Sequence, residues 1–361
     1  MSVIVDGTSG LTFNDSSLQG AAASPYVLKN RIINGAMMID QRNAGASVTI
    51  TTSNPYTLDR WRAIASQSSK FTVQQNAGSV TPPTGYTNYI GITSSSAYSV
   101  VSGDYFSVTQ YIEGYNMADF GWGASGAATI TLSFWVRSSL TGTFGGALSN
   151  SAETYTYPFS YTISSANTWE QKSVTIAGPT SGTWVTNNGR GIELTFGLGA
   201  GSTYSGTANT WQSNWFNQPT STTSVVGTNG ATFYITGVQL EIGTSATPFE
   251  RRLYNQELAN CYRYYYLPPV GQMGAYATAS QLTVAYSFPI TMRATPTISG
   301  TSATFGFTKP WILGGLTGQF DSNEQASTNY ASINYSSLSS TGSIGNPIVV
   351  NTNDVQFSAE L

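Results

Sequence analysis

TITLSFWVR, at residues 129–137, places apolar side chains at every second position from Ile130 to Val136, and all the positions between them except Trp135 are polar. Successive side chains of a strand point to opposite faces, so this period of two indicates a strand with one buried face. The same alternation recurs in SVTI at 173–176 and in IELTFGL at 192–198. Clusters of Gly, Pro, Asn and Ser separate these runs, and helical periodicity is almost absent from them. We therefore predict an all-β fold, with an antiparallel β-sandwich of the jelly-roll kind over residues 30–250.

The alternation changes phase within FYITGVQLEI at residues 233–242. Apolar residues fall on odd positions up to Ile235 and on even positions from Val238 onward, and Gly237 lies at the change. An extra residue in one strand produces such a slip, and glycine is common there. We predict a β-bulge at Gly237.

One segment, residues 255–265, has helical periodicity. Asn255 is the predicted N-cap, Glu257 suits the positive end of the helix dipole, and Pro268 and Pro269 follow the helix. Its apolar face is formed by residues at spacings of four, three and four, namely Tyr254, Leu258, Cys261 and Tyr265. The helix predicts a short connection between two β-domains.

These patterns predict an N-terminal attachment segment (1–29), the sandwich (30–250), a helical connector (251–269) and a C-terminal β-domain (270–361). A frayed tail is the alternative for residues 1–29. The C-terminal domain is expected to be a smaller β-sandwich, because QLTVAYSF at 281–288 again alternates. Residues 319–345, rich in Ser, Asn and Thr, predict a face made mainly of loops.

The composition excludes much chemistry. The chain has no histidine, only 9% charged residues, and a net charge of −3, with 22 Tyr, 16 Phe and 8 Trp. Histidine is the usual general base and the commonest metal ligand, and nucleic-acid binders need a positive field. We therefore expect no enzyme activity, no cofactor or metal, and no nucleic-acid partner. A calcium ion held by sandwich loops is the alternative for the metal, because oxygen ligands abound, but no loop has the usual density of acidic residues. A single cysteine, Cys261, allows no disulfide within the chain.

Neither a signal peptide nor a membrane span is expected. The N-terminus lacks a basic start followed by an apolar run, and no run of eighteen apolar residues occurs. These features are typical of a protein that is made in a cytoplasm and released as part of a particle.

Several segments carry a family resemblance. SVIVDGTSGLTFND at 2–15, NRIINGAM at 30–37 with LDRW at 58–61, TPFERR at 247–252 with ELANCYRYY at 257–265, FPITMRATP at 288–296 and FSAEL at 357–361 keep a common order. Together they resemble tailed-bacteriophage virion structural proteins of the tail-fibre-like kind, with a carbohydrate-module-like jelly-roll domain. The resemblance implies a trimeric virion appendage, assembled in the host cytoplasm and attached to other virion proteins through its N-terminal segment.

Two loop-like stretches supply candidates for binding a host-surface glycan, because aromatic faces stack on sugar rings and polar groups hold hydroxyls. The candidates are Tyr115, Asp119 and Trp122 in the first stretch, and Tyr204, Trp211, Asn214 and Trp215 in the second. Packing of the tryptophans beneath their loops is the alternative.

Two charged segments have other predicted roles. Glu250, Arg251, Arg252 and Glu257 are candidates for a clamp between subunits, with an exposed charged turn as the alternative. Residues 59–62 are predicted to lie on a strand with Trp61 in the sandwich core; the alternative is a ligand platform.

A hydrolase without histidine would need a pair of carboxylates across a cleft. The acids weighed for this role are scattered along the chain: Asp104, Glu113, Asp119, Glu153, Glu170 and Glu193. The preferred function is thus a trimeric, non-enzymatic tail appendage that contributes to glycan recognition. The alternatives are an architectural adaptor that binds only virion proteins, and a capsular depolymerase.

Overall fold

A computed structural model of the chain describes residues 28–300, 302–307, 316–339, 343–345, 347–353 and 355–361. Of the first 27 residues it describes only three short antiparallel strands, β1 (Ile4–Asp6), β2 (Gly10–Thr12) and β3 (Leu18–Gln19). The predicted attachment segment therefore lies largely outside the described residues. No helix in the described part is long and apolar enough to cross a membrane.

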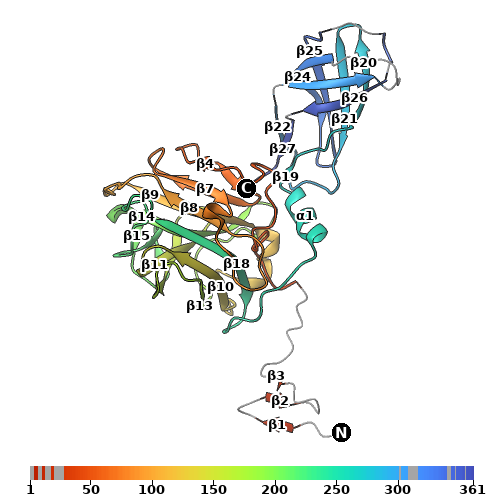
Figure 1. The fold of residues 1–361 in the computed structure, drawn as a ribbon. Helices are drawn as coiled ribbons and strands as arrows, with labels where there is room; N and C mark the ends of the chain where they lie inside the picture. Colours follow the sequence, from red (N-terminus) through yellow and green to blue (C-terminus); the bar gives the residue numbers. More distant parts are fainter. Residues whose placement is uncertain are drawn as a thin grey trace.

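Two antiparallel sheets form the central sandwich (Figure 1). The strands of the first are β4 (Val48–Thr49), β7 (Phe71–Gln75), β8 (Ile90–Ser94), β10 (Ile130–Ser138), β13 (Glu170–Ile176) and β18 (Thr232–Ile242). The strands of the second are β5 (Tyr56–Leu58), β6 (Trp61–Ala65), β9 (Tyr105–Glu113), β11 (Gly142–Asn150), β12 (Tyr155–Ile163), β14 (Arg190–Ala200) and β16 (Gln212–Ser213). The sheet orders are β13-β10-β18-β8-β7-β4 and β16-β12-β11-β14-β9-β6-β5. The predicted all-β sandwich is confirmed.

The core fills the space between these sheets. The apolar parity of β10 is fully buried, and Phe134 of β10 meets Phe196 of β14 with ring centroids 5.0 Å apart. The inward residues of β14 are Ile192, Leu194, Phe196 and Leu198, all fully buried. Short additions complete this part of the chain: the parallel pair β15 (Ser205–Gly206) and β17 (Gln218–Pro219), and the 3-10 turns η1 (Ala77–Ser79), η2 (Gly114–Asn116), η3 (Ala118–Phe120) and η4 (Ser202–Tyr204).

The predicted bulge is present in β18. Its pairing with β10 shifts between Ser133 and Trp135, opposite Gly237, which has φ of 61°. The left-handed conformation is easy for glycine and strained for other residues. The change of parity in the sequence thus corresponds to a shift of register in the strand pairing.

The helix α1 (Tyr254–Tyr262) differs from its prediction at both ends. Leu253 holds the N-cap position and no side chain caps the helix there, so the predicted Asn255 cap is wrong. The helix stops short of residue 265 because Tyr265 and Tyr266 form β19 (Tyr265–Tyr266), which pairs with β27 (Gln356–Ser358). Pairing to a distant strand overrides the local helical pattern.

The C-terminal unit is a closed six-stranded antiparallel barrel, not the second sandwich that was predicted. Its strands are β20 (Met273–Thr278), β21 (Gln281–Ser287), β23 (Ser302–Phe307), β24 (Leu316–Ala326), β25 (Tyr330–Ser336) and β26 (Pro347–Asn353). The sheet closes because β20 pairs with both β21 and β26. The loop-rich face predicted for 319–345 is also wrong, since β24 and β25 cover much of it and pair with each other. Pairing on both sides holds these polar strands despite their weak intrinsic preference.

A small sheet joins the barrel to the sandwich. Its strand order is β19-β27-β22, where β22 spans Thr297–Ser299. In Figure 1 this sheet and α1 lie between the sandwich and the barrel, and the C-terminal end of the chain returns to the sandwich.

We expect Gly237→Ala to destabilise the sandwich more than Gly230→Ala does. Both glycines have positive φ, but a Cβ at Gly237 would lie 2.6 Å from the Tyr86 hydroxyl oxygen, whereas Gly230 faces open space. The backbone strain should lower the unfolding free energy by about 1–2 kcal/mol in each variant. The clash should remove about 1–3 kcal/mol more in Gly237→Ala. Urea unfolding measures both, and equal losses would contradict the bulge geometry.

Candidate functional site

The outer face of the seven-stranded sheet carries a cleft. On β9, Phe106 and Val108 point into the core, so Tyr105 and Tyr111, of the opposite parity, point outward. The cleft has a volume of about 490 Å³. Its lining residues come from the sheet and from the loops above it: Asn54, Arg62, Ile64, Tyr105, Tyr111, Ala152, Glu153, Glu193, Tyr204 and Trp215.

Three aromatic rings form one wall. Tyr105, Tyr204 and Trp215 meet edge to face, with centroids 4.8 Å apart for the two tyrosines and 5.2 and 5.3 Å for their contacts with Trp215. All three side chains are half-buried, so part of each ring remains accessible. Tyr204 is the last residue of the 3-10 turn η4, and Trp215 follows the edge strand β16 by two residues. Edge-to-face packing fixes the rings relative to one another and leaves a rigid apolar surface.

Charged and hydroxyl groups form the rest of the lining. The register places Glu193 on β14 directly opposite Tyr111 on β9. Arg190 contacts two acids, with Nη2 3.0 Å from Glu153 Oε1 and Nη1 3.6 Å from Glu193 Oε2. Arg62 donates from Nη1 to the Tyr111 hydroxyl at 2.7 Å. An apolar wall facing convergent polar groups is typical of a small-molecule site.

Glu193 is the most perturbed group of the cleft. Burial raises its pKa to about 7, although the neighbouring Arg190 acts in the opposite direction. The side chain is only 1% exposed, and its Oε2 accepts no hydrogen bond. The carboxyl group therefore lies beneath the accessible surface and changes charge near neutral pH.

The structure places only part of the second predicted stretch at this cleft. Tyr204 and Trp215 line it. Asn214 is an exposed neighbour with φ of 80°, and its backbone NH donates to the Thr154 carbonyl. Its side chain does not line the cleft.

The other two predicted tryptophans belong to a second aromatic cluster. Trp122 is buried, and its ring centroid lies 4.7 Å from Trp184 and 5.4 Å from Trp211. Trp211 is half-buried, stacks on Tyr155 at 5.5 Å and donates to the Ala177 carbonyl at 2.8 Å. Packing, the alternative reading, thus describes Trp122.

Tyr115 and Asp119 lie away from the cleft on adjacent 3-10 turns. Tyr115 is 62% exposed. Asp119 pairs with Arg31, with Oδ2 2.5 Å from Nη2, so its carboxylate is already engaged. The structure does not bring these residues together with Tyr204 or Trp215.

The predicted subunit clamp has partners within its own chain. Arg252 pairs with Glu250 at 3.1 Å and with Glu257 at 3.3 Å, and it donates to the Ile32 carbonyl. These contacts fasten the start of the sandwich to the segment before α1. Arg251 is exposed, with its guanidinium 4.7 Å from the centre of the Tyr86 ring.

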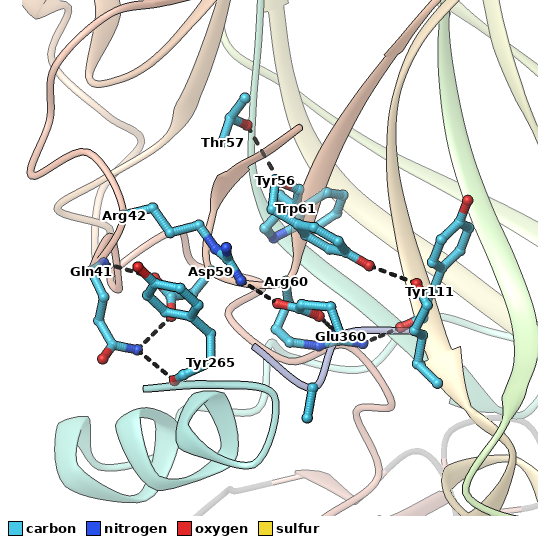
Figure 2. A network of polar contacts seen from close by, with 12 residues as sticks. Gln41, Arg42, Tyr56, Thr57, Asp59, Arg60, Trp61, Tyr111, Tyr265 and Glu360 are labelled. Atoms are coloured by element: carbon cyan, nitrogen blue, oxygen red, sulfur yellow. Dashed lines mark hydrogen bonds and ion pairs between the residues drawn. The ribbon is translucent and has the colours of Figure 1, made fainter. Parts of the chain in front are cut away.

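A buried ion network lies where the C-terminal end meets the sandwich (Figure 2). The Glu360 carboxylate contacts both Arg60 and Arg42, the latter at 2.8 Å. Arg60 is 1% exposed, and its guanidinium lies 3.6 Å from the centre of the Tyr264 ring. Arg60 also donates to the backbone carbonyl of Tyr111, the residue whose side chain lines the cleft.

The prediction of a strand over residues 59–62 is wrong for residues 59 and 60. Asp59 and Arg60 form the turn between β5 and β6, and Arg60 has φ of 68°. Because of this turn, the Arg60 side chain reaches Glu360 at the C-terminal end of the chain. Trp61 is fully buried in the sandwich core, as the preferred interpretation expected.

Sequence reasoning missed the cleft residues that come from the sheet, namely Arg62, Tyr105 and Tyr111. One signal was available, because Tyr105 and Tyr111 occupy the polar parity of a strand whose other parity is apolar. Glu153 and Glu193 were weighed as scattered acids, and the fold brings both to one cleft. Among the described residues no group of three or more acids and cysteines is placed to hold a metal ion.

We expect Glu360→Ala to lower the unfolding free energy by about 3–5 kcal/mol, because it leaves the buried Arg60 guanidinium without its counter-charge. Asp119→Ala is the control: it removes a pair whose acid is 41% exposed, and it should cost about 1 kcal/mol or less. Thermal and urea unfolding of both variants test this. Similar losses would show that the Glu360 network is not a main source of stability.

Comparisons with known proteins give structural matches only. No family model matches the chain, and no curated protein does. Among solved structures, it is similar to the enzymatically active domain of bacteriophage CBA120 tailspike protein 4, with a TM-score of 0.33 and 12% identity over 59% of this chain. The match spans 21% of that tailspike domain.

Two further solved structures match this chain over all or nearly all of their own length. A family 11 carbohydrate-binding module from Clostridium thermocellum matches with a TM-score of 0.27 and 9% identity, over 56% of this chain and 99% of that one. The CBM22-1–CBM22-2 tandem domain of Paenibacillus barcinonensis Xyn10C matches with a TM-score of 0.28 and 8% identity, over 89% of this chain and 100% of that one.

Proposed function

We propose that the chain binds glycans through the cleft formed by Tyr105, Tyr204 and Trp215. The observation that carries this proposal is the fixed aromatic wall opposite hydroxyl, amide and charged groups. The CH faces of a sugar ring pack on aromatic surfaces, and its hydroxyl groups need hydrogen-bond partners beside them. Both kinds of surface are present within one cleft of about 490 Å³.

We further propose that this binding serves a tailed-phage virion appendage, a trimer that contacts the host surface and is assembled in the host cytoplasm. The ordered sequence resemblance over the whole chain supports this role. The N-terminal segment would attach the appendage to other virion proteins. An adaptor that binds only virion proteins would have no use for the accessible aromatic cleft, so the cleft favours a ligand-binding role.

A depolymerase is the second candidate, since Glu153 and Glu193 share the cleft and Glu193 has a raised pKa. Glycoside hydrolysis needs two carboxyl groups that both reach the scissile bond. Glu193 is 1% exposed, so its carboxyl group does not reach a sugar on the surface. We therefore propose binding without hydrolysis.

We expect Trp215→Ala to weaken glycan binding about tenfold or more, equivalent to about 1.4 kcal/mol, because it removes the ring that contacts both tyrosines. The measurement is binding of the full chain to a glycan array, followed by titration of the retained glycans. Trp169→Ala is the matched control, since Trp169 is also half-buried but lies beside Tyr89, away from the cleft.

Two outcomes would contradict this assignment. Equal binding by Trp215→Ala and the unaltered chain would exclude the cleft. New reducing ends from a retained glycan, abolished by Glu193→Gln, would support the depolymerase instead.

The trimer is tested separately by native mass. We expect a particle of three times the 38.4 kDa chain mass at micromolar concentration. A monomer that persists over this concentration range would contradict the proposed trimer, but would leave glycan binding by the cleft unaffected.

A further inference from the structure

Arg62 is the cation of the cleft that has no acidic partner. Its Nε donates to the Asn54 carbonyl at 2.7 Å, and its Nη1 donates to the Tyr111 hydroxyl at 2.7 Å. Within the described part of the chain, no carboxylate oxygen lies within 4.0 Å of its guanidinium and no hydrogen bond from Nη2 is formed. Arg62 is half-buried and lines the cleft. A guanidinium held by neutral acceptors retains its full positive charge and several free donors.

The neighbouring arginines differ in this respect. Arg190 contacts Glu153 and Glu193, and Arg60 contacts Glu360. Their charges are balanced within the chain, whereas that of Arg62 is not balanced by direct contact. A planar guanidinium binds a carboxylate through two parallel hydrogen bonds, which gives both affinity and orientation.

From this arrangement we propose that the cleft selects glycans that carry a carboxylate, such as those with uronic or sialic acid residues, and that Arg62 binds that carboxylate. The inference rests on the proposed glycan-binding function of the same cleft. The aromatic wall would hold the sugar ring while Arg62 holds its acid group. A neutral glycan would leave the Arg62 charge desolvated without compensation, and that loss is the source of selectivity.

The charge of the cleft depends on pH. The groups that face Glu193 are Arg190 from the same strand, Arg62 from β6, Tyr111 from β9, Glu153 and Trp215. Because the pKa of Glu193 is about 7, this group is mostly neutral at pH 6 and mostly negative at pH 8. The cleft therefore carries one more negative charge at pH 8 than at pH 6, on Glu193. An anionic ligand should therefore bind more weakly at the higher pH.

The test uses the full chain on a glycan array that contains neutral, uronic-acid and sialic-acid oligosaccharides, at pH 6 and pH 8. We expect acidic glycans to be retained, and Arg62→Gln to weaken their binding tenfold or more. Arg137→Gln is the control, because Arg137 lies on β10 of the other sheet, donates to the Asn167 carbonyl and likewise has no carboxylate contact in the described residues. Arg62→Lys keeps the charge but loses the planar guanidinium, so its affinity for acidic glycans should lie between those of Arg62→Gln and Arg137→Gln.

The pH arm has its own variant. Binding of acidic glycans should weaken from pH 6 to pH 8, and Glu193→Gln should abolish this difference. Unfolding curves of every variant confirm that each one is folded before its binding is compared.

The outcomes separate this inference from the proposed function. Retention of neutral glycans that Trp215→Ala abolishes and Arg62→Gln leaves unchanged would overturn the carboxylate selectivity and keep the glycan-binding cleft. Failure of every class of glycan to bind would overturn both. Binding of acidic glycans that Arg62→Gln and Arg137→Gln weaken equally would reduce the effect to general charge and would also overturn the role of Arg62.

Discussion

The structure depends on one constraint, the alternation of side chains across the seven-stranded sheet. Phe196 is one of the inward-facing residues of β14, and it packs against Phe134 of the facing sheet at a ring-centroid distance of 5.0 Å. The same strand then has to present Glu193 on its other face. The core and the cleft are therefore two sides of one set of strands. Close packing of the inner parity holds the outer parity in place, which is how a binding surface gains rigidity from a scaffold.

Local pattern was sufficient for the all-β class, for the central sandwich and for details that depend on neighbours along the chain. The parity of β10 and the slip at Gly237 were both readable, because each is a property of a short continuous segment. The closure of the barrel and the early end of α1 were not, because each is decided by a distant pairing partner. Tyr265, for example, joins a strand with Ser358 instead of extending the helix. Such pairings follow from the whole fold and override local preference.

For the same reason, only part of the candidate site could be predicted from the sequence. Tyr204 and Trp215 could be proposed because aromatic residues in a polar loop are unusual wherever they occur. The cleft residues on the sheet have no comparable feature in their local sequence. They meet because β9 lies between β14 and β6, which brings together three segments that are distant in the chain. Trp122 was assigned to glycan binding from its sequence context alone. Its burial depends on the residues that pack against its loop, and in the structure Trp184 packs against it.

The pairing of β19 with β27 gives the chain a modular plan. Tyr266, just before the barrel, lies opposite Phe357, just after it. The barrel is therefore an insertion whose entry and exit are fastened side by side, while Glu360 returns the chain to the sandwich. A domain of another shape could replace the barrel between these two anchor points without altering the path of the sandwich strands, provided that it keeps a strand in the place of β22, which lies between β21 and β23 in the chain and also pairs with β27. Exchange of the distal module during evolution, or by design, would leave the cleft and its supporting core intact.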